Sequence, residues 1–384
     1  MNEDFFSFRR IGLIGGGQLG KMTAQVAKRM GFTVQILDPS PLAPATPVSD
    51  LHVVGSLYDE GKLRELASLS DVLTYDIEHI DTHTLITLER EGHLILPSPF
   101  LLEIIQDKFQ QKQILAQHGV PVPRFEQVEK LDEAYLKTVS LPIVQKARKG
   151  GYDGKGVVIL RTLEDEKQLL SVPSFLEEWI ECSKELAVIV ARTPTGDIAC
   201  YPVAEMVFDD RTNICDIVAV PAQIDEITTQ KAQQVALHAV EALNGVGIFG
   251  VEMFLTPQGD ILVNEIAPRP HNSGHYTIEA CVTCQFEQLV RIVGGLPLGE
   301  VSLLRPAVMW NLLGEAEYTG TPVVEGLKEA LSIPGVSFHF YGKTTTYPFR
   351  KMGHITILAD NLSQAFNKLN MVKTILKVKG SEKL

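Results

Sequence analysis

Two glutamates that interrupt neighbouring apolar segments constrain the fold of this chain more than any other feature. Glu252 lies within Phe249–Leu255 and Glu265 lies within Ile261–Ile266, with the linker Thr256–Asp260 between them. A β-turn in this linker, with its glycine at the position that tolerates φ > 0, predicts an antiparallel hairpin. One uninterrupted register then places Glu252 opposite Glu265.

The facing carboxylates require a positive charge between them. Directly opposed side chains have Cβ atoms about 4.5 to 5.5 Å apart, and like charges at that distance oppose folding. A divalent cation resolves this most simply, and one or two carboxylates completed by water and phosphate oxygens describe magnesium bound to a nucleotide. A solvated hairpin end is the competing interpretation, which is disfavoured because acidic pairs rarely interrupt apolar strands.

Length and composition narrow the class of protein. A chain of 384 residues is too long for one ordinary core and predicts two or three domains. Its 45% hydrophobic and 21% charged residues indicate a soluble globular protein, and no apolar stretch approaches the roughly 20 residues of a membrane span. Residues 1–10 lack the long apolar region of a secretory signal, so we expect a cytoplasmic protein. The net charge of -12 argues against a general nucleic-acid binder.

The cysteines are scattered and odd in number, which is typical of reduced thiols rather than a disulfide framework. They stand at positions 182, 200, 215, 281 and 284. Cys281 and Cys284 have the spacing of half a zinc site or of a redox pair. We expect them to pack inside a helix over Thr277–Val293, because residues three apart share a helix face and a structural zinc site needs four ligands.

The first 97 residues alternate between strand and helix patterns, which predicts a parallel sheet. Strand Ile11–Ile14, a glycine-rich turn, an amphipathic helix and strand Thr33–Leu37 form a βαβ unit. Further strands are predicted at 51–54 and 72–75, with helices at 61–68 and 81–91. We therefore place the first domain at residues 1–97.

The glycine-rich turn leaves two interpretations open. Gly15-x-Gly17-x-x-Gly20 follows a strand, opens a helix and has Asp38 about 20 residues further on, as in a dinucleotide-binding fingerprint. Taken alone, this pattern favours an NAD-dependent oxidoreductase. A helix N-terminus attracts any anion, however, so a substrate contact near Gln18 fits equally well.

The second domain, residues 98–295, contains a second glycine-rich segment. A long helix is predicted over Phe100–His118, and strand Leu141–Lys146 leads into Gly150–Gly156, which has four glycines. Its backbone amides can close over phosphates, whereas a plain hairpin needs only one or two glycines. Lys146 follows an apolar run, where an unpaired ammonium is costly unless it meets an anion.

Downstream patterns fit a nucleoside site and a third segment. Phe175–Ile180 enters a connection before Glu185, which offers an apolar slot for a base and a carboxylate for a ribose. Residues 296–384 form the third segment, with strands predicted near 307–312, 337–341 and 355–358.

These features, in this order, resemble the ATP-grasp superfamily. Four motifs resemble the 5-(carboxyamino)imidazole ribonucleotide synthase family within it, and the likeness covers about Ile11 to Leu358. The motifs are Gly-Gly-Gly-Gln-Leu-Gly-Lys-Met22, Gly-Gly-Tyr-Asp-Gly-Lys-Gly156, Ala-Pro-Arg-Pro-His-Asn-Ser-Gly-His275 and Arg350-Lys-Met-Gly-His354. The resemblance implies α/β and α+β architecture: a Rossmann-like pre-grasp domain, an ATP-grasp domain with a mobile lid at about 121–190, and a small β-rich C-terminal domain.

The resemblance also implies an activity and a set of partners. The activity is ATP-dependent carboxylation of 5-aminoimidazole ribonucleotide by bicarbonate through carboxyphosphate, in de novo purine biosynthesis. ATP and Mg²⁺ would be required, a homodimer is expected, and neither nucleic acid nor membrane would be a partner. The formate-dependent glycinamide ribonucleotide transformylase shares an Arg-Pro-His motif and is the nearest alternative, and a catalytically silent ATP-binding protein is another.

Site residues follow from the resemblance position by position. Arg269 and His271 would be catalytic, and Glu252 and Glu265 would bind the metal. Substrate contacts would come from Gln18, Glu78, Lys343 and Arg350. ATP would be held by Lys108, Lys146, Gly151, Tyr152, Asp153, Gly154, Lys155, Gly156, Val157, Glu177, Glu178, Trp179, Ile180, Glu185, Asn264 and Glu265. Two positions depart from the family: Asp76 stands where Glu is common, which leaves open whether Asp76 or Glu78 meets substrate, and Phe208 replaces a residue that is often polar.

Overall fold

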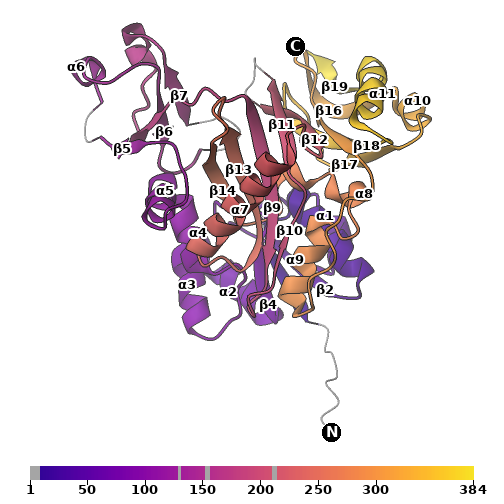
Figure 1. The fold of residues 1–384 in the computed structure, drawn as a ribbon. Coiled ribbons are helices and arrows are strands. Elements are labelled where there is room, and N and C mark those ends of the chain that lie inside the picture. Colours follow the sequence, from indigo (N-terminus) through magenta and orange to yellow (C-terminus); the bar gives the residue numbers. More distant parts are fainter. Residues whose placement is uncertain (1–8, 129–130, 152–155, 210–213) are drawn as a thin grey trace.

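The computed structural model describes residues 9–128, 131–151, 156–209 and 214–384. Figure 1 shows an α/β domain at the bottom, a large sheet through the centre, a small projecting domain at the upper left and the C-terminal elements at the upper right. This is the predicted combination of α/β and α+β architecture. Among the described residues, no helix combines the length and apolar character needed to cross a bilayer.

The N-terminal domain is the predicted parallel sheet, with strand order β3-β2-β1-β4. Its strands are β1 (Arg10–Ile14), β2 (Thr33–Asp38), β3 (Leu51–Val54) and β4 (Val72–Tyr75). They alternate with α1 (Gln18–Arg29), η1 (Thr46–Val48), α2 (Glu60–Leu69) and α3 (Thr82–Arg90). Leu13 and Ile36 are fully buried, as a sheet covered on both faces requires.

The single helix predicted over 100–118 is wrong, because the chain forms two helices that meet at Asp107. Helix α4 (Pro99–Gln106) ends there and α5 (Lys108–Gln117) begins there. The Asp107 carboxylate accepts hydrogen bonds from the backbone amides of Phe109 and Gln110, and it pairs with Arg148 at 2.6 Å. This N-cap sets the direction of α5 independently of α4.

The projecting domain is built on a four-stranded antiparallel sheet of order β5-β8-β6-β7 over the described residues. The strands are β5 (Phe125–Gln127), β6 (Ile143–Ala147), β7 (Val157–Leu160) and β8 (Ser174–Glu178). Helices α6 (Glu133–Leu136) and η2 (Leu163–Gln168) complete it. Gly150, Gly151 and Gly156 of the second glycine-rich segment lie in the connection between β6 and β7.

The central sheet joins the predicted second and third segments. Over the described residues its order is β14-β13-β9-β11-β12-β15-β18-β17, with β10 on β9. The strands are β9 (Lys184–Arg192), β10 (Ile198–Cys200), β11 (Ala204–Asp209), β12 (Ile214–Val220), β13 (Gly247–Leu255), β14 (Ile261–Ala267), β15 (Ala307–Leu313), β17 (Val336–Phe340) and β18 (Lys351–Leu358). Pairing of β12 with β15 makes the C-terminal strands a continuation of the ATP-grasp sheet.

Helices and a small two-stranded sheet cover this central sheet. Helix α7 (Glu226–Ala242) packs on β9, β13 and β14, and α9 (Gln285–Gly294) packs on β9 and β13. The other elements are η3 (Asn272–Gly274), α8 (Thr277–Ala280), β16 (Tyr318–Glu325), α10 (Leu327–Leu331), α11 (Leu362–Ile375) and β19 (Lys377–Lys383). In Figure 1, α10 and α11 lie beside β16 and β19 at the upper right.

The helix predicted over 277–293 is also wrong. It is interrupted after α8, where Cys281 has extended backbone and forms an isolated bridge to Leu303. Cys284 caps α9, and its Sγ accepts a hydrogen bond from the Glu287 amide at 3.4 Å. All five cysteines are free thiols, and burial raises the pKa of Cys281 to about 12.

The predicted hairpin of β13 and β14 is confirmed, and Glu252 pairs with Glu265. The predicted uninterrupted register is wrong, because a β-bulge separates the pair from the turn: Met253 pairs with Val263, which leaves Asn264 as an extra residue. Val263 and Ile266 both pack in the core beneath α7. Asn264 and Glu265 therefore both face away from that core.

Candidate active site

The opposed glutamates lie on the face of the central sheet that α7 does not cover. Glu265 forms an ion pair with Lys108, the first residue of α5. Glu252 lies 3.5 Å from Nε2 of His271, measured from its Oε1. Glu185 on β9 points to the same face, because it lies two residues before Ala187, which pairs with Glu252.

The carboxyl groups on this face have shifted pKa values because they are buried and lie close to other charged groups. Burial and the nearby Glu265 carboxylate raise the pKa of Glu252, whereas the Lys108 ammonium lowers the pKa of Glu265. Burial raises the pKa of Glu185 to about 7. Lys108 pairs directly with Glu265, while Lys146 and Lys351 act on these carboxylates from further away. A divalent ion at Glu252 and Glu265 would offset the repulsion between the two.

The donor set suits magnesium carried by a nucleotide. Among the residues that the structure describes, no three His, Cys, Asp or Glu side chains are grouped so that they could hold a metal ion. A pair of carboxylates whose remaining positions are filled by phosphate and water oxygens is the usual magnesium arrangement. The residues present therefore fit Mg²⁺ bound together with ATP.

A second cluster of charges lies behind this face. Lys146, on β6, forms an ion pair with Glu177 at 2.5 Å and donates a hydrogen bond to Oδ1 of Asn264 at 2.8 Å. Lys112, on α5, forms an ion pair with the other Glu177 oxygen at 2.6 Å. Two lysines therefore occupy the two oxygens of the Glu177 carboxylate, which holds Lys146 in place.

Lys112 is a site residue that the sequence reasoning missed. Its side chain is 2% exposed, and burial lowers its pKa to about 8. It lies four residues after Lys108 on α5, a spacing that puts both ammonium groups on one helix face. That spacing is the signal that could have found it. The helix is fixed to β14 by Gln111, whose amide bonds both backbone groups of Ile266.

The glycine-rich tip and the connection after β8 border the same region. Gly150 and Gly156 have positive φ, and Val157 pairs with Lys146 across the hairpin. At the connection after β8, Glu178 is exposed and Ile180 is half-buried. The guanidinium carbon of Arg161 lies 4.9 Å from the centre of the Trp179 ring. Gly151 is half-buried. Four residues of the expected ATP-binding loop, Tyr152, Asp153, Gly154 and Lys155, lie outside the described residues.

Arg269 joins the ATP-grasp domain to the N-terminal domain. Its Nη2 lies 3.0 Å from Oε1 of Glu78, in the connection after β4. The structure thus brings together one expected catalytic residue and one expected substrate contact. His271 follows two residues later on the same segment.

The first glycine-rich turn is filled by the protein's own carboxylates. Oδ2 of Asp76 accepts a hydrogen bond from the Gly20 amide at 2.7 Å, and Oδ2 of Asp38 accepts one from the Gly16 amide at 2.8 Å. A Cβ on Gly15, which has φ +99°, would lie 1.7 Å from Asp76. Because Asp76 takes an amide in the first turn of α1 and leaves no room beside Gly15, the arrangement disfavours a pyrophosphate there. Burial raises the pKa of Asp76 to about 7.

The loop between β17 and β18 lies against the start of α1, where Gln18 is the first residue. Lys21 donates hydrogen bonds to the carbonyl groups of Phe340 and Tyr341, at 3.0 and 3.2 Å. The same loop carries two expected phosphate contacts. Lys343 donates to the Lys351 carbonyl at 2.6 Å, and Arg350 donates to the Thr345 carbonyl at 2.7 Å.

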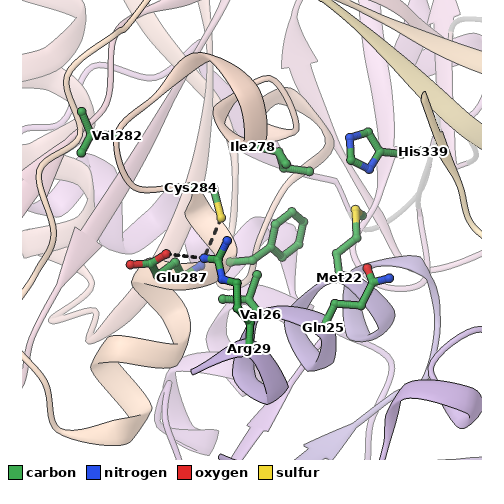
Figure 2. A pocket seen from close by; sticks show the side chains of 10 residues that line it. Met22, Gln25, Val26, Arg29, Ile278, Val282, Cys284, Glu287 and His339 are labelled. Atoms are coloured by element: carbon green, nitrogen blue, oxygen red, sulfur yellow. Dashed lines mark hydrogen bonds and ion pairs between the residues drawn. The ribbon is translucent and has the colours of Figure 1, made fainter. Parts of the chain in front are cut away.

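A small pocket lies apart from these groups, between α1 and the α8–α9 region. Its volume is 160 Å³, and the Arg29–Glu287 ion pair of 2.6 Å closes one side (Figure 2). Its walls come from Met22, Gln25, Val26, Arg29, Ile278, Val282, Cys284, Phe286, Glu287 and His339. None of these residues is among the expected site residues.

Comparison with known domain families accounts for most of the chain. Residues 8–106 match the ribonucleotide synthetase preATP-grasp domain, residues 113–286 the ATP-grasp domain, and residues 307–368 the phosphoribosylaminoimidazole carboxylase C-terminal domain. These matches define the class: the protein is an ATP-grasp ligase with a pre-grasp domain and a small C-terminal domain.

Comparison with individual proteins is more specific. The chain is 40% identical to the N5-carboxyaminoimidazole ribonucleotide synthase of Bacillus subtilis over 91% of both proteins. It is 53% identical to the crystal structure of the corresponding synthetase from Thermotoga maritima, with a TM-score of 0.91 over 97% of this chain and 100% of that one. The chain belongs to the N5-carboxyaminoimidazole ribonucleotide synthase family.

Longer relatives also match. The chain is 42% identical to the chloroplastic phosphoribosylaminoimidazole carboxylase of Vigna aconitifolia, over 94% of this chain and 66% of that protein. It therefore spans about two thirds of the length of that carboxylase. The comparisons confirm the expected family and the expected fold class.

Proposed function

We propose that this chain uses ATP to carboxylate 5-aminoimidazole ribonucleotide with bicarbonate, giving 5-(carboxyamino)imidazole ribonucleotide, ADP and phosphate in de novo purine biosynthesis. The observation that carries the proposal is the Glu252–Glu265 pair beside Lys108 and Lys146. The names of the relatives support it. So does a structure from Aspergillus clavatus in complex with ADP and 5-aminoimidazole ribonucleotide, which is 34% identical with a TM-score of 0.87 over 96% of this chain and 99% of that one.

The first step is phosphorylation of bicarbonate, which converts a poor electrophile into one with a leaving group. Lys146 and Lys108 bind the phosphates and neutralise charge on the transferring oxygens. Mg²⁺ held by Glu252 and Glu265 would supply further neutralisation of that charge. Glu185 accepts hydrogen bonds from the ribose. We assign adenine to backbone groups of Glu178, Trp179 and Ile180, and the β- and γ-phosphates to the loop Gly151–Val157.

The second step is collapse of carboxyphosphate to carbon dioxide and phosphate, followed by capture by the exocyclic amine. Arg269 suits bidentate binding of a planar carboxylate-like group, and its ion pair with Glu78 places it beside the ribonucleotide. His271 can move a proton between the amine and phosphate. Exclusion of water by the closed lid protects carbon dioxide until it reacts.

The ribonucleotide lies, on this proposal, between the two domains. Lys343 and Arg350 bind its phosphate, and Gln18 and Glu78 orient its ribose and amine. Asp76 is buried against the amide of Gly20, so between the two acidic residues of this connection we assign Glu78 to the substrate.

Five further features belong to the proposal. Mg²⁺ is the metal, the protein acts in the cytoplasm, and two copies form a homodimer. The domains are residues 1–97, 98–295 with the lid at about 121–190, and 296–384. Small molecules, and neither nucleic acid nor membrane, are its partners.

One assay tests the function. ADP release that requires both bicarbonate and 5-aminoimidazole ribonucleotide is the expected result. Stimulation by formate and glycinamide ribonucleotide would instead assign the chain to transformylase chemistry. Binding of ATP without turnover under any of these conditions would contradict the proposal. Tight binding of NADH, measured by the change in NADH fluorescence, would also contradict it.

A further inference from the structure

The segment His271–His275 is held from two sides, and one of them is the side chain of Gln285. Gln285 is fully buried at the start of α9. Its Oε1 accepts a hydrogen bond from the His271 amide, and its Nε2 donates to the His271 carbonyl, both at 2.8 Å. Nε2 also lies 3.1 Å from Nδ1 of His275. One side chain therefore fixes the backbone that carries His271.

The other side belongs to the C-terminal strands, beginning with Asn311 on β15. Asn311 and Asn272 exchange two amide hydrogen bonds, at 2.9 and 2.7 Å. The Asn311 amide nitrogen donates a third bond to the Cys215 carbonyl at 2.8 Å. Because its donor and its acceptor are both engaged and the side chain is 1% exposed, Asn311 has one favourable orientation.

Three histidine rings extend the contact from the segment to β18 and β17. The rings of His275 and His354 lie 4.7 Å apart, and those of His354 and His339 lie 4.4 Å apart at 14°. Nδ1 of His354 is 3.0 Å from the Tyr341 hydroxyl, and His339, which also borders the pocket of Figure 2, lies 2.6 Å from Glu279. Burial keeps the pKa of His275 and of His354 well below the usual value, so the two inner rings stack without charge repulsion.

An ordinary domain contact would not need this chemistry. Buried amides and imidazoles cost free energy unless each finds a partner, whereas apolar side chains of similar size fill the same space without that cost. The amide pairs of Gln285 with His271 and of Asn311 with Asn272 meet on the segment that carries His271. The adjacent loop of the same strands carries Lys343 and Arg350, so one rigid unit connects both ends of the proposed substrate.

We propose that Asn311 and His354 are positioning residues for His271, so that the C-terminal strands set the geometry of carboxyl transfer as well as binding the substrate phosphate. The inference rests on the proposed function for its chemical meaning. Its structural content, that these two side chains hold the segment His271–His275, can be tested without turnover.

The kinetic test compares His354→Ala and Asn311→Leu with conservative partners. We expect both variants to lower kcat about tenfold and to release more ADP per carboxylated product, with the KM for ATP changed less than twofold. His354→Phe keeps the stacked ring and Asn311→Gln keeps the amide donor and acceptor, so each should recover at least half of the lost coupling. Leu369→Ala removes a buried side chain from the α11 core of the same domain and should leave the coupling unchanged.

The structural test measures hydrogen exchange in the peptide that contains residues 271–275. Exchange at least fivefold faster in His354→Ala and Asn311→Leu, but not in Leu369→Ala, is the expected result. If either variant fails to fold, its conservative partner gives the same comparison at smaller amplitude. Unchanged exchange in both His354→Ala and Asn311→Leu, or equal uncoupling by Leu369→Ala, overturns the inference. Parent protein that lacks bicarbonate-dependent ADP release would refute the proposed function instead, while the exchange result would still judge the positioning.

Discussion

The site contains two clusters of lysine and glutamate side chains that differ in composition and exposure. The inner cluster is Lys112, Lys146 and Glu177, and the hairpin cluster is Lys108, Glu252 and Glu265. In the inner cluster one carboxylate, Glu177, is 1% exposed and serves two lysines that are 2% and 11% exposed. In the hairpin cluster one lysine, Lys108, serves Glu265, which is 41% exposed, and lies near Glu252, which is 14% exposed. The inner cluster therefore has two lysines for one carboxyl group, and the hairpin cluster has two carboxyl groups for one lysine.

The difference indicates how a nucleotide would be oriented. A metal–triphosphate complex has its cation on one side and its anionic oxygens on the other. The hairpin cluster suits the cation and Lys146 suits the oxygens, so the protein is charged in complement to both. Asn264 accepts a hydrogen bond from Lys146 and is next to Glu265 in sequence, so this one residue lies between the inner cluster and the hairpin cluster.

Replacement of Glu177 by Gln should break the inner cluster and give the largest effect on stability. Two buried ammonium groups would lose their counter-charge, and breaking such a pair typically costs about 3 to 5 kcal/mol. Urea unfolding at pH 7 would measure the loss. The matched variant Lys112→Met leaves Glu177 paired with Lys146 and should lose less, and an equal loss in both would show that the carboxylate is not the centre of the cluster.

Replacement of Glu265 by Gln should remove one carboxylate of the hairpin cluster while keeping a side chain of the same size. We expect kcat to fall about 10² to 10³-fold, as is typical when one preorganised electrostatic group is lost. Steady-state ADP formation over a range of Mg²⁺ concentrations would measure it. Glu205→Gln, on β11 and paired with Lys184 at 2.6 Å, is a matched control in a half-buried ion pair. A decrease of less than threefold in Glu265→Gln would argue against the metal assignment.

Replacement of Lys146 by Met should weaken phosphate binding while the hairpin cluster remains. The lost charge should raise the KM for ATP roughly 10-fold, equivalent to about 1.4 kcal/mol. Isothermal titration with a non-hydrolysable ATP analogue would separate binding from turnover. Lys149→Met, three residues further on, controls for general loss of positive charge near the lid. Equal weakening in both variants would mean that Lys146 has no special contact.

Asp76 extends the comparison to a carboxylate that is buried without a lysine, and its effect depends on pH. Because burial raises its pKa from 3.8 to about 7, the folded protein binds a proton that the unfolded chain has lost over this interval. Stability from this group is thus present below pH 4 and is lost as pH rises toward 7. Asp76→Asn should flatten the fall of unfolding free energy between pH 4 and 7 by up to about 1.4 kcal/mol per pH unit. Urea midpoints at several pH values would show it, and parallel curves for both proteins would contradict the burial argument.

Local patterns predicted the elements and the acidic pair, but not the contacts between remote segments. Strands and the hairpin follow from alternation and turn residues near each other in sequence. The break at Asp107 depends on Arg148, which lies about forty residues away and gives no local signal. Lys112 was within reach, because its spacing from Lys108 is helical. The stack of His275, His339 and His354 joins positions that only the tertiary fold brings together.

The bulge at Asn264 also explains how an Asn-Glu dipeptide can serve one site. Regular strands send consecutive side chains to opposite faces, so an ordinary ladder would direct Glu265 into the apolar layer beneath α7. A buried, unpaired carboxylate there would cost several kcal/mol, so a β13–β14 ladder without the bulge is unfavourable. The charge of Glu265 therefore stabilises the bulge that turns its side chain away from the core. We expect an apolar residue at position 265 to favour regular pairing of β13 with β14.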